Sequence, residues 1–239
     1  MVLTDRQKEI LNTIVQEYIG SAEPISSKLL ENKYDFGICP ASIRIEMQKL
    51  TDGGFLHQPH TSAGRIPTDK SYRLLVSDLL EEDFEKTKNR KMIKEFQEIE
   101  EEMNDSFKFF QFLTKKVAEM TNSLTLSYLS DKDIFLKEGW ADIVKEPEFE
   151  DNDYLLRFFE TSENLEENLK RLKPDSGIKV YIGNENPLTK SDDFSLITSR
   201  YEFPEKGEGL LAVFGPKRMP YQRNIELFNS LITLLEEGS

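Results

Sequence analysis

The side chains best suited to contact DNA lie on one face of a predicted helix near the N-terminus. Pro40 begins this helix and Gly53-Gly54 ends it. On a helical wheel, Ile43, Met47 and Leu50 share the side that would pack on other helices. The opposite side and its flanks carry groups that can donate hydrogen bonds to base edges and phosphates or contact a thymine methyl. The candidates for DNA contact on this helix are Ser42, Arg44, Ile45, Gln48 and Lys49.

A second group of hydrogen-bond donors follows in a segment that is predicted to form a β-hairpin. Apolar residues at 55–56 and Ile66 flank a polar stretch containing glycine and proline, a pattern typical of two short strands joined by a turn. Side chains at such a tip, next to a DNA-reading helix, can donate to phosphates or enter a minor groove. The candidates here are His60, Thr61, Ser62 and Arg65.

The reactive residue types argue against catalysis and against a bound metal. The chain has one cysteine, Cys39, and two histidines, His57 and His60, which both lie in the predicted hairpin. Cys39 precedes a helix-starting proline, without the neighbouring base that nucleophilic catalysis requires. The two histidines have a spacing that could suit zinc, but the sequence offers too few other cysteine or histidine ligands. We therefore expect no enzyme, no cofactor and no metal site.

Three short helices are predicted to position the candidate DNA contacts. Thr4 and Gln7 form a capping-box pattern, and apolar residues at helical spacing follow to about Gly20. A second helical segment begins at Pro24, and the third is the helix from Pro40. Three helices with brief connections are typical of a helix-turn-helix unit, and a hairpin directly after it makes a winged helix. A helix whose polar face only contacts solvent would show the same spacing, so both interpretations stay open here.

The next segment carries a series of apolar residues with heptad-like spacing. From Met92 to Leu124 these residues recur at alternating steps of four and three, interrupted at Ser106. The pattern predicts either one long connecting helix that dimerises or two successive helices that pack on their own domain. A continuous helix over this range would be roughly 50 Å long.

The remaining part of the chain combines strands with helices. A last amphipathic helix begins at Tyr221. Helices at both ends of a group of strands predict a small α+β domain. The other expected elements are strands over Leu124–Leu129 and Ile178–Ile182, a helix over 151–172, and a hairpin of Ser195–Phe203 with Leu210–Phe214.

The net charge of the 239-residue chain is −13, which at first argues against a nucleic-acid partner. Residues 1–80 carry nine basic and ten acidic residues, so the surplus of acidic residues lies almost entirely in residues 81–239. This division indicates two modules with different partners. The sequence has no apolar run near the roughly 18 residues of a membrane span and no secretion signal at its start, so we expect a cytoplasmic protein without membrane contact.

Several stretches resemble the HrcA family of bacterial heat-inducible transcription repressors. The longest is QPHTSAGRIPTDK, which begins at Gln58 and is followed by Tyr72-Arg73. The predicted helix PASIR from Pro40 resembles the family's recognition helix, and the opening LTDRQKEIL also matches. Two positions differ, because Ile45 stands where the family usually has asparagine and Ser71 where it usually has glycine. Further matches are Gly139, Pro147-Glu148-Phe149, Ile182-Gly183, Glu185-Asn186-Pro187, Ser195-Leu196-Ile197, Gly215-Pro216, Arg218-Met219 and Tyr221.

The resemblance implies a two-module chain of the α+β class. Residues 1–80 would form a winged helix-turn-helix DNA-binding domain, residues 81–122 a connecting or dimerising helical segment, and residues 123–239 a GAF-like α+β domain. That domain would lack much of the segment that the family inserts there, since only Ser130–Leu136 bridges the region. The implied function is negative regulation of chaperone operons by a homodimer. Its implied partners are an inverted-repeat operator of the CIRCE type in double-stranded DNA and the GroE chaperonin.

A second class of function stays open on the residues themselves. The C-terminal module could sense a small molecule, or the chain could be a protein-interaction adaptor whose winged helix does not bind DNA. The acidity of residues 81–239 and the apolar Ile45 on the free helix face would suit an adaptor. Binding to a palindromic operator distinguishes the two classes.

Overall fold

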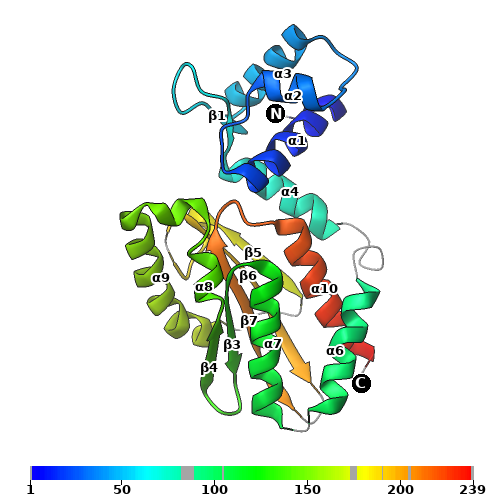
Figure 1. Ribbon diagram of the computed structural model, residues 1–239, viewed down its shortest axis with the longest axis vertical. Coiled ribbons are helices and arrows are strands. Elements are labelled where there is room, and N and C mark those ends of the chain that lie inside the picture. Colours follow the sequence, from blue (N-terminus) through cyan, green and yellow to red (C-terminus); the bar gives the residue numbers. More distant parts are fainter. Residues whose placement is uncertain are drawn as a thin grey trace. The chain divides into compact units, whose positions relative to one another are not determined.

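The structure is a computed structural model, and it describes residues 2–81, 89–103, 105–172, 177–189, 191–203 and 206–237. The chain divides into two units, Met1–Asp78 and Leu79–Ser239. Figure 1 shows the first unit as a group of short helices with a hairpin and the second as a sheet with helices on both faces. Helix α4 (Asp69–Glu81) begins in the first unit and ends in the second.

The first unit contains the three predicted helices and the predicted hairpin. The capping box is present, because the Thr4 hydroxyl accepts from the Gln7 amide nitrogen and the Gln7 side chain accepts from that of Thr4. The elements are α1 (Asp5–Ser21), α2 (Ser27–Lys33) and α3 (Pro40–Asp52), followed by β1 (Leu56–His57) and β2 (Ile66–Pro67), which pair antiparallel.

Helix α2 is shorter than the sequence predicts. The Ser26 hydroxyl caps it by accepting from the Leu29 amide nitrogen. Just before this cap, Ile25 forms an isolated antiparallel bridge with Arg65 of the hairpin. The apolar sides of the three helices then close the core, and burial of each such side chain contributes about 1.5–3 kcal/mol. These buried side chains include Ile10, Leu11, Ile14, Val15, Leu30, Ile43, Met47 and Leu50.

The second unit is built on a five-stranded antiparallel sheet in the order β4-β3-β7-β6-β5. The strands predicted at 124–129, at 178–182 and in the later hairpin are confirmed. The strand at 134–138 was not predicted from the sequence. The strands are β3 (Leu124–Leu129), β4 (Ile134–Glu138), β5 (Ile178–Ile182), β6 (Phe194–Phe203) and β7 (Gly207–Pro216).

Helices cover both faces of this sheet, as Figure 1 shows. One face packs against α9 (Asn152–Arg171) and the short helices before it, with Phe158 and Phe214 stacked at 4.9 Å between ring centroids. The other face packs against α7 (Ser106–Thr121) and α10 (Tyr221–Glu237), where the Phe110 and Tyr201 rings stack at 4.9 Å. The helical elements are α6 (Arg90–Glu102), α7 (Ser106–Thr121), α8 (Trp140–Ile143), η1 (Pro147–Glu150), α9 (Asn152–Arg171), η2 (Gly183–Glu185) and α10 (Tyr221–Glu237).

The prediction of one long connecting helix over Met92–Leu124 is wrong. The helix ends at Glu102 and a new one begins at Ser106, where the Asp105 carboxylate caps it by accepting from the Lys108 amide nitrogen. Helix α6 packs along α10, and α7 packs on the sheet through buried side chains such as Phe109. The alternative of two successive helices on their own domain is what the structure has. Heptad-like spacing could not distinguish the two, because a helix that packs on a sheet also buries positions three and four apart.

Arg218 joins two distant stretches of the second unit. This residue is 8% exposed and lies in the turn between β7 and α10. Its Nε lies 2.5 Å from Glu148 Oε1 and one terminal nitrogen lies 2.8 Å from Glu148 Oε2, so the pair is bidentate. That terminal nitrogen also lies 2.5 Å from Glu146 Oε2. Two separate stretches that resemble the HrcA family are thus tied by one guanidinium.

Replacement of Arg218 should destabilise the second unit strongly. Arg218→Ala leaves two partly buried carboxylates without their cation, and we expect a loss of about 2–4 kcal/mol in the free energy of unfolding. Urea unfolding followed by fluorescence of Trp140, the one tryptophan, measures this. Arg157→Ala is the control, because it removes an exposed ion pair with Asp193 and should cost less than about 1 kcal/mol. Equal losses in the two variants would contradict the assignment.

Candidate nucleic-acid interface

Helix α3 presents one face to solvent and buries the other. The side around Met47 is buried, as the wheel predicts. Ile45 is 55% exposed although it is apolar, and Arg44, Gln48 and Lys49 beside it are polar or charged. The division of the helix into two faces is confirmed, and the DNA-binding role of the free face stays a prediction. The exposed residues of α3 are Ala41, Arg44, Ile45, Gln48, Lys49 and Asp52.

The first turn of α3 carries Ser42 next to the cysteine that precedes the helix. Cys39 stands at the N-cap without a capping side-chain bond, and Pro40 is the first helical residue. The half-buried Ser42 has its hydroxyl 3.3 Å from Cys39 Sγ. This hydrogen bond, together with the Ser42 backbone, lowers the pKa of the exposed Cys39 thiol. Ser42 lies in the first turn of α3. Side chains at the start of a helix commonly reach a phosphate.

Arg44 and Lys49 hold different positions on the free face. Arg44 Nε donates to Ser27 Oγ at 3.1 Å, which places its guanidinium against the start of α2. Lys49 Nζ lies 2.8 Å from Glu46 Oε1 and is thus already paired with a carboxylate. Only Arg44 of these two cations is bound to a neutral partner here, so its charge is the less compensated of the two.

The hairpin presents three polar residues at its tip. The Gln58 side-chain amide donates to the carbonyls of Thr61 and Ala63, at 3.0 Å each, and so shapes the turn. His60, Thr61 and Ser62 are exposed, as expected for a segment that could reach a nucleic-acid backbone.

Gly64 allows the hairpin to approach the residues before α2. Backbone bonds of 2.9 and 2.8 Å join Ile25 and Arg65 in both directions. A Cβ on Gly64 would lie 2.5–2.6 Å from backbone atoms of Pro24 and Ile25, closer than any side chain can come. Glycine is therefore required at position 64 if the hairpin is to stay paired to the segment before α2.

Arg65 connects the hairpin directly to α3. Its Nε donates to Thr51 Oγ1 at 3.0 Å and a terminal nitrogen donates to Gln48 Oε1 at 3.2 Å. The Gln48 amide nitrogen in turn donates to Asp52 Oδ1 at 2.8 Å. The structure thus brings together two predicted site residues from separate segments, Gln48 and Arg65, and fixes which way the Gln48 amide points.

The base of the hairpin is held by residues that the sequence did not mark as structural. Thr68 Oγ1 donates to the Gly54 carbonyl at 2.8 Å, and Lys70 Nζ donates to the Gly53 carbonyl at 2.8 Å. The buried Ser71 hydroxyl donates to the Phe55 carbonyl. Serine at position 71 therefore supplies a hydrogen bond that the family's usual glycine could not. These residues clamp the chain where α3 passes into the hairpin.

A polar network also ties the start of α1 to α3. The buried Gln7 donates through Nε2 to Glu46 Oε2 at 2.9 Å, while Lys49 binds the other oxygen of the same carboxylate. Lys49 and Gln7, in that order of effect, hold the pKa of Glu46 below its ordinary value. The capping-box pattern could indicate Gln7 as a helix cap, but spacing alone gave no sign of its bond to Glu46, 39 residues away.

Within the described residues, no group of three or more His, Cys, Asp or Glu side chains could hold a metal ion. A search of the same part of the chain finds no helix long and apolar enough to cross a membrane.

Comparison with known proteins decides the family. A family model described as "HrcA protein C terminal domain" matches residues 66–225, which is more than half of the chain. The chain belongs to the HrcA family. The Leu79–Ser239 unit is accordingly a GAF-like α+β domain of HrcA type, and the resemblance of its motifs to the family is confirmed.

Relatives named "Heat-inducible transcription repressor HrcA" match almost the whole chain. The protein from Natranaerobius thermophilus is 30% identical over 329 aligned positions, covering 95% of this chain and 94% of the relative. That from Thermodesulfovibrio yellowstonii is 28% identical over 334 positions, covering 96% of each. Both alignments are longer than the 239 residues present here, so a part of each HrcA relative has no counterpart in this chain.

A solved structure described as "Crystal structure of a hypothetical protein at 2.2 A resolution" has the same fold. Its TM-score is 0.78 at 22% sequence identity, and the match covers 98% of both chains. HrcA relatives are named as repressors and not as enzymes, in line with the absence of a catalytic pattern in the sequence.

The Glu46 network should make the first unit sensitive to acid. Because the folded-state pKa of Glu46 is lowered from 4.5, its stabilising effect is fully present above that value. The stabilisation by Glu46 is lost as the pH falls from about 4.5 through the lower pKa that Glu46 has in the folded state. We expect Glu46→Gln to destabilise the first unit at pH 7 and to flatten this acid dependence. Ring-proton NMR signals of the two histidines, both in the hairpin, report unfolding of this unit. An unchanged pH profile in the variant would contradict the role of Glu46.

Proposed function

We propose that this chain represses transcription of heat-shock operons by binding DNA through α3 and the hairpin of β1 and β2. The hydrogen bond between Arg65 and Gln48 supports this most directly, because it sets the hairpin beside the free face of α3. A helix that fits a major groove, with a hairpin fixed next to it, has the arrangement that a winged helix needs. Membership of the HrcA family adds independent support.

In this proposal residues 1–80 form a winged helix-turn-helix domain with α3 as the recognition helix. Arg44 and Gln48 read base edges, and Ile45 contacts a thymine methyl, which would explain its exposure of 55%. The remaining proposed contacts go to phosphates or the minor groove. They are made by Ser42, Lys49, His60, Thr61, Ser62 and Arg65.

The hydrogen bonds of Gln48 to Arg65 and Asp52 determine how its side chain could bind a base. Its Oε1 accepts from Arg65 and its Nε2 donates to Asp52, so each atom keeps further hydrogen-bonding capacity for a base. The adjacent Asp52 carboxylate repels phosphates, and within DNA it can accept a hydrogen bond only from a base donor such as the cytosine amino group. Specific sites are therefore favoured over random DNA at this end of α3.

We further propose that the chain acts as a dimer on an inverted repeat of the CIRCE type. One near-neutral domain makes few phosphate contacts, and a two-fold dimer doubles them on a palindromic site. The bound dimer would block transcription. Heat would lower the active fraction, since a marginally stable domain unfolds after a loss of a few kcal/mol. Family membership is the support for the GroE chaperonin as a regulator that keeps the repressor active.

The remaining assignments follow from the same proposal. Residues 81–122, whose helix α7 packs on the sheet of the GAF-like unit, connect residues 1–80 to residues 123–239 and take part in the dimer contacts. The cytoplasm, where the operators are, is the proposed location.

Loss of Arg44 or Arg65 should weaken operator binding. Each arginine is proposed to contact DNA once per half-site, and one such contact contributes about 1–3 kcal/mol, so we expect a loss of about tenfold or more for Arg44→Ala. Gel-shift titration with an inverted repeat from upstream of a chaperone operon measures this. Lys33→Ala is the control, because it removes one positive charge from the same unit at a residue paired with Glu17. Binding unchanged by Arg44→Ala and Arg65→Ala, or weakened equally by Lys33→Ala, would contradict the assignment of these contacts.

The exposed Ile45 favours one alternative, a protein-interaction adaptor that does not bind DNA. Alkylation of Cys39 distinguishes this adaptor from a DNA-binding repressor, because Cys39, the one cysteine, is exposed at the start of α3. Operator DNA should slow its reaction with iodoacetamide several-fold, while a scrambled duplex of equal length should not. Equal rates with both duplexes, in a folded protein, would favour the adaptor or a small-molecule sensor.

A further inference from the structure

We propose that the GAF-like domain binds a small amphiphilic anion, a molecule with an apolar body and one negatively charged group. The site is an open cavity of about 430 Å³ beside the end of the β3–β4 hairpin and the C-terminal end of α9. Pockets that hold small molecules commonly have about 300–1,000 Å³. The lining residues used below are Tyr128, Leu169, Lys170, Leu172, Arg200 and Leu210.

Strand register places apolar side chains, Tyr128 and Leu210, beside Arg200 in the floor of the cavity, and Phe135 packs behind Tyr128. Phe135, Tyr128, Leu210 and Arg200 are successive partners across β4, β3, β7 and β6, so their side chains lie on one face of the sheet. The Phe135 and Tyr128 rings stack at 4.7 Å between centroids. Buried Leu169 of α9 belongs to the same apolar cluster. This surface suits a ring or a short hydrocarbon body.

Two cations lie beside this floor, from different elements. Lys170 of α9 has Nζ 2.5 Å from Asp133 Oδ1 and 5.7 Å from the centroids of the Tyr128 and Phe135 rings. Arg200 of β6 is paired with Glu208 of β7. The side chains of all four are 38–65% exposed, so both ion pairs are weak and a ligand anion can replace either carboxylate at little cost.

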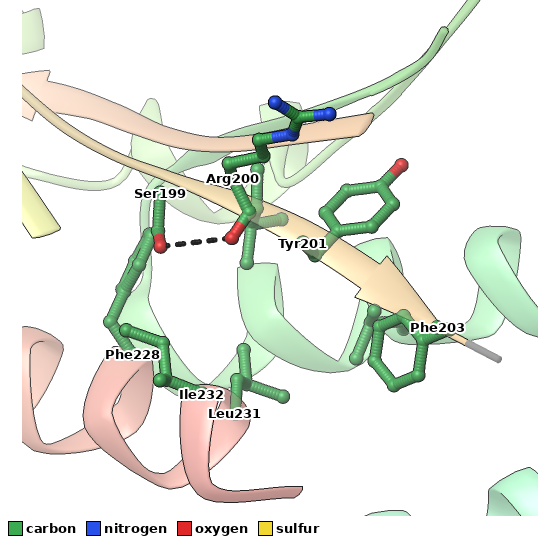
Figure 2. A pocket seen from close by; sticks show the side chains of 9 residues that line it. Ser199, Arg200, Tyr201, Phe203, Phe228, Leu231 and Ile232 are labelled. Carbon is green, nitrogen blue, oxygen red and sulfur yellow. Dashed lines mark hydrogen bonds between the residues drawn. The ribbon is translucent and has the colours of Figure 1, made fainter. Parts of the chain in front are cut away.

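Two other cavities of the domain suit a small anion less well than this one. Across the sheet, a cavity of about 10 Å³ has space for one water at most. Figure 2 shows that Arg200 points away from this small cavity, whose lower side is formed by Phe228, Leu231 and Ile232. The other, of about 290 Å³ beside Gly139, is lined by three acidic residues and one lysine, which disfavours an anion.

Binding of 8-anilinonaphthalene-1-sulfonate, an aromatic sulfonate, tests the proposal on the full chain without DNA. Its fluorescence should rise on binding, and Lys170→Gln and Arg200→Gln should each raise the Kd about threefold. The double variant should raise it about tenfold. Lys115→Gln, which alters the acidic cavity, and Lys145→Gln, which alters an exposed ion pair with Asp142, should leave the Kd within about twofold.

Methyl NMR of the unchanged chain gives a second readout that does not depend on any variant folding. The probe should shift the methyl signals of Leu169, Leu172 and Leu210, and leave that of Leu113, which lines the small cavity, in place. An unchanged Kd in a double variant whose Trp140 unfolding curve matches the parent chain would overturn the proposal. So would an equal effect of Lys115→Gln, or methyl shifts confined to other parts of the domain.

Discussion

The proposed DNA-binding surface depends on the hydrogen bonds that the Arg65 guanidinium donates to α3. Its two bonds to α3 orient the hairpin, while the Arg65 backbone pairs with Ile25 on the other side. Strands of two residues cannot hold a hairpin by themselves. The apolar core stabilises the three helices, and these few polar contacts determine where the hairpin lies against α3. A change at Gly64 would therefore act on the surface by moving the hairpin and not by removing a DNA contact.

The second unit also uses polar contacts to fix the positions of its elements relative to one another. Arg218 ties the segment before α9 to the turn after β7. The hydroxyl of Tyr221, at the start of α10, lies 2.7 Å from Ser195 Oγ and donates to the Lys217 carbonyl at 2.6 Å. Apolar burial has no direction, so it cannot by itself specify which end of a helix meets which strand. Directional bonds at the joins supply that information.

Local elements could be predicted from the sequence where periodicity and caps agree. The helix from Pro40 and the strand 124–129 are of this kind. Strand 134–138 was missed because it is a partly exposed strand in which apolar and polar residues do not alternate cleanly. The candidate site was only half predictable, since its residue types were visible but the pairing of Arg65 with Gln48, 17 positions apart, depends on tertiary packing. Spacing also could not show that Lys49 is already paired with Glu46.

Such pairings change how many positive charges of the first unit are available to bind phosphates. Of the cations in the near-neutral first unit, Lys33 and Lys49 are bound to carboxylates and Lys70 to a backbone carbonyl. Fewer positive charges are then available for phosphates than the sequence count suggests, and the acidic second unit adds long-range repulsion. Under the proposed function we therefore expect a low affinity for random DNA, because binding to random DNA depends almost wholly on phosphate contacts. Under the proposed function, discrimination between DNA sites must then come from hydrogen bonds and apolar contacts to bases, which are the contacts proposed for Arg44, Ile45 and Gln48.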